Sequence, residues 1–298
     1  MSWAGSFGSS GAISGASRAM SGEFVSGREA DGSTAAVTSR GWRFMIRVFN
    51  ALLPAAVFFA LIVAWWAAVD IGKVPSYLLP PPEDVLPRIV ADHQSFINHS
   101  WITIQEILLG FGWSVVTAIP LGLLIALSPL AKRMLYPLLV FIQLVPKIAI
   151  APLFVVWLGF GLTSKVMLTL LLTFFPLLLA SIAGFQILDQ RLLYLTRSMG
   201  ATTWQTFRYL RFPAALPVIF GGLKTSATIA ATAAIVAEFV GSNKGLGYVL
   251  LQGTANLDMT RVFAVLFLLT IIGLALNSIV EAIEYFMTPW QRNQARAD

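Results

Sequence analysis

The stretch DQRLLYLTRSMGATTWQTFRYLRFPAALP, residues 189–217, separates two long apolar runs at residues 166–188 and 216–240. A run of about 20 mostly apolar residues is long enough to cross a bilayer as a helix. The stretch between the runs carries four arginines, and arginine is costly in hydrocarbon. We therefore expect this stretch to lie at a membrane surface, between two membrane-spanning helices.

The same stretch has the pattern of two short helices joined at a glycine. Its apolar positions recur at helical spacing and comprise Leu192, Leu193, Leu195, Thr196 and Met199. Gly200 is expected to end the first helix, because glycine readily adopts the left-handed conformation found there. Thr203 can cap a second helix over residues 204–210. Pro213 and Pro217 are expected to end that helix and to begin the next span.

Four further apolar runs extend the pattern along the chain. They cover residues 48–69, 107–130, 135–160 (interrupted by Pro146-Lys147) and 262–283. The chain is 57% hydrophobic and only 11% charged, with a mean hydropathy of +0.78. Those proportions exclude an ordinary soluble enzyme, which needs polar residues to cover its surface. We predict an all-α membrane protein with six transmembrane helices.

The positions of the basic residues orient the spans. Thirteen of the 20 lysines and arginines fall in the tails and in the loops after the second and fourth runs. Because basic loops stay inside, both termini are expected to be cytoplasmic. The net charge of +6 is attributed to these loops and not to nucleic-acid binding.

Three regions are expected along the chain. Residues 1–42 are predicted to be a disordered cytoplasmic tail, since 17 of the first 39 residues are glycine or serine. Residues 43–290 are predicted to form the transmembrane domain, and residues 291–298 a short cytoplasmic tail. The chain has no cysteine, so disulfides and thiolate chemistry are excluded.

Ionisable residues inside or beside the runs are candidates for a translocation pathway, because charge in a span usually faces a cavity or a partner. Lys147 directly follows Pro146, which interrupts a span and frees a backbone carbonyl. Lys147 could attract an anionic solute, or it could pair with Glu238. Glu238 could form an outer gate or an ion pair that fixes packing. Glu106 is expected at the outer interface.

The stretch 189–217 resembles the permease signature of binding-protein-dependent ABC importers, which reads Glu-Ala-Ala, three residues, Gly and, further on, Leu-Pro. Residues 197–201 (RSMGA) and Phe207 with 212–217 (FPAALP) match it, whereas residues 194–196 (YLT) replace Glu-Ala-Ala. Other stretches are similar to the nitrate/sulfonate/taurine branch of these permeases: LVPK at 144–147, APL at 151–153, WLGFG at 157–161, FP at 175–176, AE at 237–238 and GLGY at 245–248.

The resemblance implies a transport subunit of a bacterial cytoplasmic (inner) membrane. It implies a homodimer of permease chains, two separate ABC ATPase subunits and an external solute-binding protein. The loop at 192–212 would be a coupling helix on the ATPase, with the residues Leu195, Arg197, Ser198, Met199, Gly200, Ala201, Phe207, Pro213 and Pro217. The pathway residues would be Pro146, Lys147 and Glu238. The solute would be small: nitrate, a sulfonate, taurine, or a vitamin or pyrimidine precursor, with Lys147 favouring an anion.

No cofactor is expected in this chain, because the phosphate-binding pattern G-x-x-x-x-G-K-[ST] does not occur in it. ATP and Mg would be bound by the partner ATPase. Two other functional classes remain as alternatives to an ABC importer subunit. A secondary transporter or channel would work without an ATPase and often shows inverted repeats, which are not evident here. An intramembrane enzyme would need a nucleophile or metal cluster, and two histidines without cysteine argue against one.

Overall fold

The computed structural model describes residue 53 and residues 55–290, and every regular element in this part of the chain is helical. The predicted tails 1–42 and 291–298 lie outside the described residues, as does the start of the run 48–69. The first helix is Ala55–Asp70. It is followed by α2 (Pro82–Ala91), α3 (His93–Leu127), α4 (Pro129–Leu144), η1 (Lys147–Ile150), α5 (Ala151–Leu158), α6 (Leu162–Phe185), α7 (Gln190–Ser198), α8 (Thr203–Thr206), η2 (Phe207–Arg211), α9 (Phe212–Gly241), α10 (Leu246–Ala255) and α11 (Met259–Met287).

Four helices are long and apolar enough to cross a membrane: α3, α6, the continuous helix Thr203–Gly241, and α11. They coincide with the predicted second, fourth, fifth and sixth runs. The pair Pro129–Leu144 and Lys147–Leu158 reaches the same length only when joined across a bend of 80°, so the predicted interruption at Pro146-Lys147 is a sharp break. Counting that pair as one span gives five. Helix Ala55–Asp70 is shorter, and a total of six remains a prediction.

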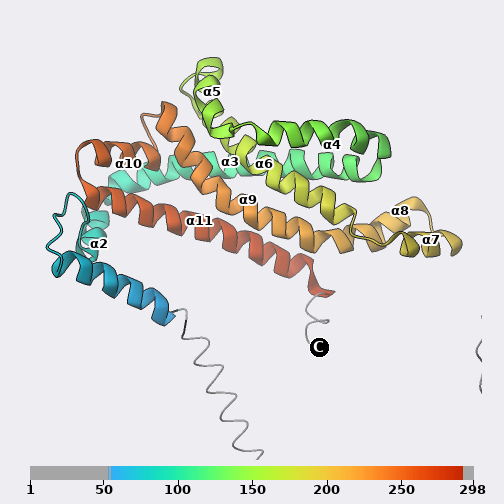
Figure 1. Cartoon of the computed structure of the whole chain (residues 1–298), viewed down its shortest axis with the longest axis horizontal. Coiled ribbons are helices and arrows are strands. Elements are labelled where there is room, and N and C mark those ends of the chain that lie inside the picture. The colour runs from blue at the N-terminus through green and yellow to red at the C-terminus, as the bar shows by residue number, and fades with distance from the viewer. Residues whose placement is uncertain (1–52, 54, 291–298) are drawn as a thin grey trace, which may run out of the picture. The chain divides into compact units, whose positions relative to one another are not determined.

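The described chain divides into two units between Leu61 and Ile62, and the contacts below all lie in the second. There α3, α6, α9 and α11 lie side by side as a bundle (Figure 1). One core cluster joins α3, α9 and α11 around Ile107, Phe220 and Leu276. A second joins α3, α6 and α9 around Ile125, Leu178 and Ile219. The bundle is thus built on the most apolar helices of the sequence.

Helix α9 lies at the centre of this bundle because its buried positions are small. Ser226, Ala227, Ala230 and Ala234 have no exposed surface, and the Ser226 hydroxyl donates to the Thr173 carbonyl of α6 at 2.9 Å. Small side chains let helix backbones approach closely where lipid supplies no hydrophobic driving force. Helix α9 therefore packs against α3, α6 and α11 at once.

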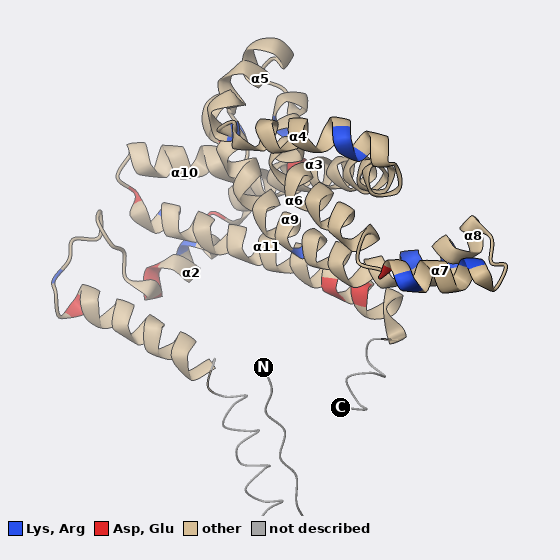
Figure 2. Ribbon diagram, turned by 45° about the vertical axis from the view of Figure 1, so that its right-hand side comes forward, with Lys and Arg blue, Asp and Glu red and all other residues tan. Residues whose placement is uncertain are grey.

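The two ends of the bundle carry different elements. Helices α7 and α8 project at one end, and α2 and α10 lie at the other (Figure 1). At the α2 end, Arg88 is 2.7 Å from Asp258, which caps the N-terminus of α11. Figure 2 shows basic residues gathered along α7 and at the start of α4. The two ends of the bundle therefore differ in charge: basic residues gather at the α7 end, whereas Arg88 is paired with Asp258 at the α2 end.

Candidate functional site

The first candidate site is the segment from α7 to η2, which begins and turns as its sequence predicts. The Asp189 side chain caps α7 by accepting from the Arg191 backbone N–H at 2.9 Å. At the other end, Gly200 has φ of +77°. Its N–H donates to the Arg197 carbonyl, and the Ala201 N–H donates to the Thr196 carbonyl, both at 3.0 Å. These two bonds make a Schellman turn, which requires the left-handed conformation that glycine tolerates.

The second half of the segment differs from the prediction in two respects. Thr202, and not Thr203, caps α8 in a reciprocal capping box with Gln205. The helix then continues without a break into the membrane span, so Pro213 and Pro217 do not separate the two. The intervening turn, Phe207–Arg211, is a π-helix. Pro213 lies in the first turn of α9, directly after this wider turn, and Pro217 lies inside α9.

Helix α7 has two faces with different surroundings. Leu192, Leu195 and Met199 recur on the outer face and are 46%, 56% and 77% exposed. Leu193 and Arg197 lie on the opposite face, where they line a hollow of about 590 Å³. Exposed apolar residues that share one face of a basic helix mark a surface able to contact a partner.

The predicted coupling residues lie in three different environments. Leu195, Ser198, Met199 and Gly200 lie on the exposed side of the turn. Arg197, Ala201 and Phe207 line the hollow. Pro213 and Pro217 are half-buried in α9. The prediction that these residues act on an ATPase is not tested by their positions.

The second candidate site is a buried polar cluster at the other end of the bundle. Glu238 has no exposed surface. Its carboxylate accepts from the Thr103 hydroxyl at 2.6 Å and from the Gly247 backbone N–H. The Thr103 hydroxyl in turn accepts from the Leu246 N–H at 2.8 Å. Glu238 thereby fixes the start of α10 against α3 and α9.

A buried ion pair lies beside Glu238. Glu106 of α3 is fully buried and is 2.8 Å from the ammonium of Lys165 in α6. Lys165 also donates to the Ser242 hydroxyl at 2.6 Å. Glu106 is therefore enclosed by the helices of the bundle, and its position at the depth of the outer interface stays a prediction. Its charge is accommodated inside the bundle because a lysine 59 residues away in sequence packs against it.

The structure does not bring the predicted pathway residues together. The Lys147 ammonium donates to the Gln143 carbonyl at 3.0 Å and lies 4.8 Å from the ring centre of Phe175. It forms no ion pair with Glu238. Pro146 precedes η1 at the break between α4 and α5. Lys147 and Glu238 are therefore separate features, one at a helix break and one in a buried cluster.

Sequence reasoning missed three members of the buried cluster: Thr103, Lys165 and Ser242. They come from three different elements, and no spacing along the chain relates them. The only signal was that Glu106, Lys165 and Glu238 all lie near predicted outer ends of spans, which places them at a similar depth but does not pair them.

Comparison with known proteins gives the family. Residues 118–293 match the family described as "Binding-protein-dependent transport system inner membrane component". The formylaminopyrimidine transport permease protein ThiX of Halalkalibacterium halodurans is 36% identical over 84% of this chain and all of its own length. The taurine transport system permease protein TauC of Escherichia coli is 29% identical over 77% of this chain and 86% of its own.

A solved structure shares the fold. A chain of the MetNI methionine ABC transporter, in an inward facing conformation, superposes with a TM-score of 0.53 at 20% identity. The superposition covers 64% of this chain and 97% of that chain. The chain therefore belongs to the binding-protein-dependent transport system inner membrane components, the multi-pass permeases of ABC importers, which are not enzymes themselves.

Proposed function

We propose that this chain and a second copy of it form the translocation pathway of an ATP-driven importer, and that a separate ATPase acts on residues 192–212. The observation that carries the proposal is the outer face of α7. Leu192, Leu195 and Met199 are exposed there on a rigid turn held by capping bonds at both ends. Such a face is suited to a groove on a partner protein.

The helix Thr203–Gly241 supplies a means of transmission. It contains 39 residues without interruption, which corresponds to a length of about 58 Å at 1.5 Å per residue. It joins the exposed segment to Glu238 at the opposite end of the bundle. A displacement applied near Trp204 would therefore reach the buried cluster through one rigid element, as a switch between two packed states requires.

The arrangement of partners follows from this direction of transmission. Two ATPase subunits, which bind ATP and Mg, would contact the α7 end on the cytoplasmic side. An external solute-binding protein would deliver solute at the α2 and α10 end. Both termini would then be cytoplasmic, as the distribution of basic residues predicts.

For the solute, we propose a small anion such as a sulfonate, nitrate or taurine. Lys147 supports this choice, because its charge lies at a helix break beside an aromatic ring and a cation in a span favours anions. A second candidate is a formylaminopyrimidine, supported by the 36% identity to ThiX. Binding of each compound to the partner solute-binding protein, measured by calorimetry, separates the two.

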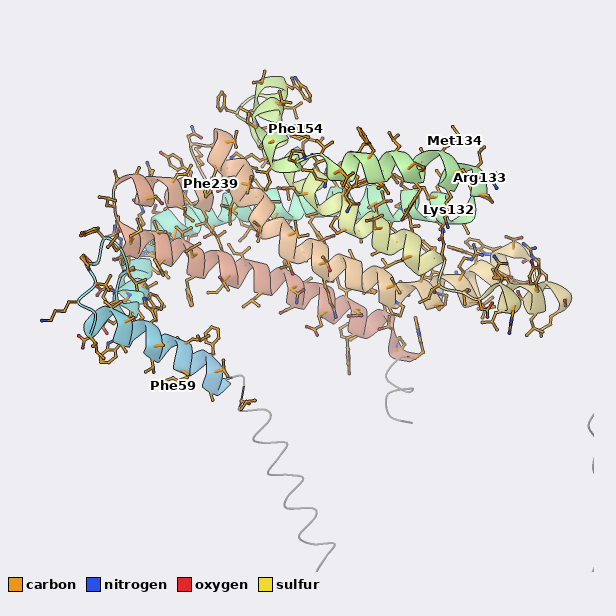
Figure 3. All side chains as sticks on the ribbon, in the orientation of Figure 1. Phe59, Lys132, Arg133, Met134, Phe154 and Phe239 are labelled. Carbon is orange, nitrogen blue, oxygen red and sulfur yellow. The ribbon has the colours of Figure 1, made fainter. Side chains whose placement is uncertain are left out.

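The test of coupling uses two exposed methionines. Met199→Arg places a charge on the outer face of α7 and is expected to abolish solute-stimulated ATP hydrolysis by the reconstituted complex. Met134→Arg is the matched control, because Met134 is 67% exposed in the second turn of α4 (Figure 3). It should retain hydrolysis and uptake.

Two outcomes would contradict the proposal. One is normal stimulated hydrolysis and uptake in Met199→Arg. The other is accumulation of solute by the chain alone in vesicles with a proton gradient and no nucleotide, since that result would indicate a secondary transporter.

A further inference from the structure

The inner side of the α7–α8 segment borders two hollows. The larger has a volume of about 590 Å³ and the smaller about 360 Å³. Leu193 and Arg211 line both, so the two hollows adjoin at these side chains. The space lies between the C-terminal end of the span α3 and the surface helices α7 and α8. It therefore reaches from the membrane-spanning bundle to the surface segment.

The wall of the larger hollow combines apolar and basic side chains. Its apolar members are Leu123, Leu127, Leu193, Ala201, Trp204 and Phe207. Its charged members are Arg197 and Arg211. Trp204 and Phe207 stack with ring centres 5.7 Å apart, as aromatic residues often do at the membrane–water boundary. The hollow thus resembles a boundary between hydrocarbon and headgroups.

The charged side chains that line the two hollows are all basic. Within residues 55–290, no acidic side chain lines either hollow. Among the residues that the structure describes, neither Arg197 nor Arg211 takes part in an ion pair. The smaller hollow adds Lys132, whose ammonium donates to the neutral amide of Gln186 at 2.9 Å. Three cations therefore face this open space without a compensating anion from the described residues.

We propose that this space binds one anionic phospholipid, with its phosphate on Arg197 and Arg211 and the start of an acyl chain along Leu123 and Leu127. Two guanidinium groups can bind a phosphate through paired, charge-assisted hydrogen bonds. Basic pockets between membrane helices bind anionic headgroups for the same reason. The apolar side chains at the end of α3 would contact the acyl chain of the lipid, which a free phosphate lacks.

The site shares Arg197, Ala201 and Phe207 with the segment proposed for the ATPase, but not the outer face of α7. Leu192, Leu195 and Met199 face away from the hollow, so a partner can contact that face while a lipid occupies the hollow. A bound lipid would brace α7 and α8 against α3 and so set the position of the segment that the partner contacts. Binding of the lipid can be measured without the ATPase, so the two proposals stand or fall separately.

The experiment is native mass spectrometry of the full chain released from detergent after incubation with phosphatidylglycerol or phosphatidylcholine. The parent chain should retain one phosphatidylglycerol in preference to phosphatidylcholine. Arg211→Gln and Arg197→Gln should each weaken retention of phosphatidylglycerol by about fivefold, in line with the contribution of one basic residue near an anionic surface. Arg208→Gln is the matched control, because Arg208 is exposed on the same π turn but lines neither hollow.

A variant with a larger side chain in the hollow tests whether the lipid occupies this space. Leu193→Trp keeps all three cations but occupies the shared space, and it should reduce retention of phosphatidylglycerol as strongly as the arginine variants do. Circular dichroism melting of each variant shows whether the chain is folded. The proposal is overturned if the folded double variant R197Q/R211Q retains phosphatidylglycerol like the parent, if Arg208→Gln loses it equally, or if inorganic phosphate displaces it.

Discussion

The Lys165 ammonium lies 2.8 Å from a carboxylate oxygen of Glu106, with side chains only 7% and 0% exposed. Lys165 stands in the first turn of α6 and Glu106 in the first half of α3. A bond from Lys165 to Ser242 adds the end of α9. One lysine thus joins three elements of the bundle at the end opposite α7. Under the proposed function, this is the end of the bundle that the helix Thr203–Gly241 must displace.

Lys165→Ala is expected to destabilise the folded chain strongly. Removing one partner of a buried ion pair leaves the other charge without compensation, which costs about 3–5 kcal/mol in the free energy of unfolding. Thermal unfolding of the purified chain in detergent measures the loss. Lys132→Ala is the matched control, because Lys132 bonds only a neutral amide near the surface, and its midpoint should change little.

The double variant E106Q/K165M gives the decisive comparison for the same pair. It removes both members of the pair together, while Glu238 keeps its bonds from Thr103 and from the Gly247 N–H. It should therefore recover much of the stability lost in Lys165→Ala. A double variant no more stable than Lys165→Ala would show that packing, and not charge compensation, determines the cost.

Glu238 is expected to tolerate an amide better than a truncation. The Thr103 hydroxyl donates to Oε1 of its carboxylate and the Gly247 N–H to Oε2. Glu238→Gln keeps an oxygen for only one of these two donors, and its NH2 group can donate to Glu106, whose Oε2 atom has no hydrogen-bond donor among the described residues. It should therefore unfold below the parent's temperature but above that of a truncated variant.

Glu238→Ala is the contrasting variant. It leaves the Thr103 hydroxyl and the Gly247 N–H without their acceptor, at a cost of about 1–3 kcal/mol for each buried group. Unfolding temperatures of the two variants, compared in the same detergent, test the difference. Equal destabilisation would mean that both carboxylate oxygens are required at this position.

Gly245 is expected to accept no other residue. Its φ is +104°, and a β-carbon there would overlap the Glu238 carboxylate. Gly245→Ala should therefore lower the free energy of unfolding by about 1–3 kcal/mol from backbone strain alone, and it should displace the start of α10. Gly221→Ala is the control, since a β-carbon at Gly221 meets nothing within 4 Å. A neutral Gly245→Ala would contradict the assigned backbone conformation.

Local patterns in the sequence were sufficient to predict four of the spans and the turn at Gly200, because hydrophobic runs and capping depend on neighbours in the chain. The prediction that Pro213 and Pro217 end the surface helix was wrong, since the helix runs on from Thr203 to Gly241. The buried pair of Glu106 with Lys165 was not predicted, because its two members come from different helices. Neither feature can be read from the spacing of residues along the chain.

Lys147→Ala is expected to reduce uptake more than it reduces stability. Lys147 is only half-buried, and its bond to the Gln143 carbonyl lies within one turn of the helix break, so little of the bundle depends on it. A charge-assisted bond to an anionic solute contributes about 1.5–3 kcal/mol, so uptake at saturating binding protein should fall roughly tenfold or more. Lys147→Arg keeps the charge and should retain most activity. Lys244→Ala, at an exposed position between α9 and α10, should leave uptake unchanged. If Lys147→Ala transports like the parent, the cation is not part of the pathway and the proposal of an anionic solute loses its support, whereas the assignment to the permease family rests on other residues and stands.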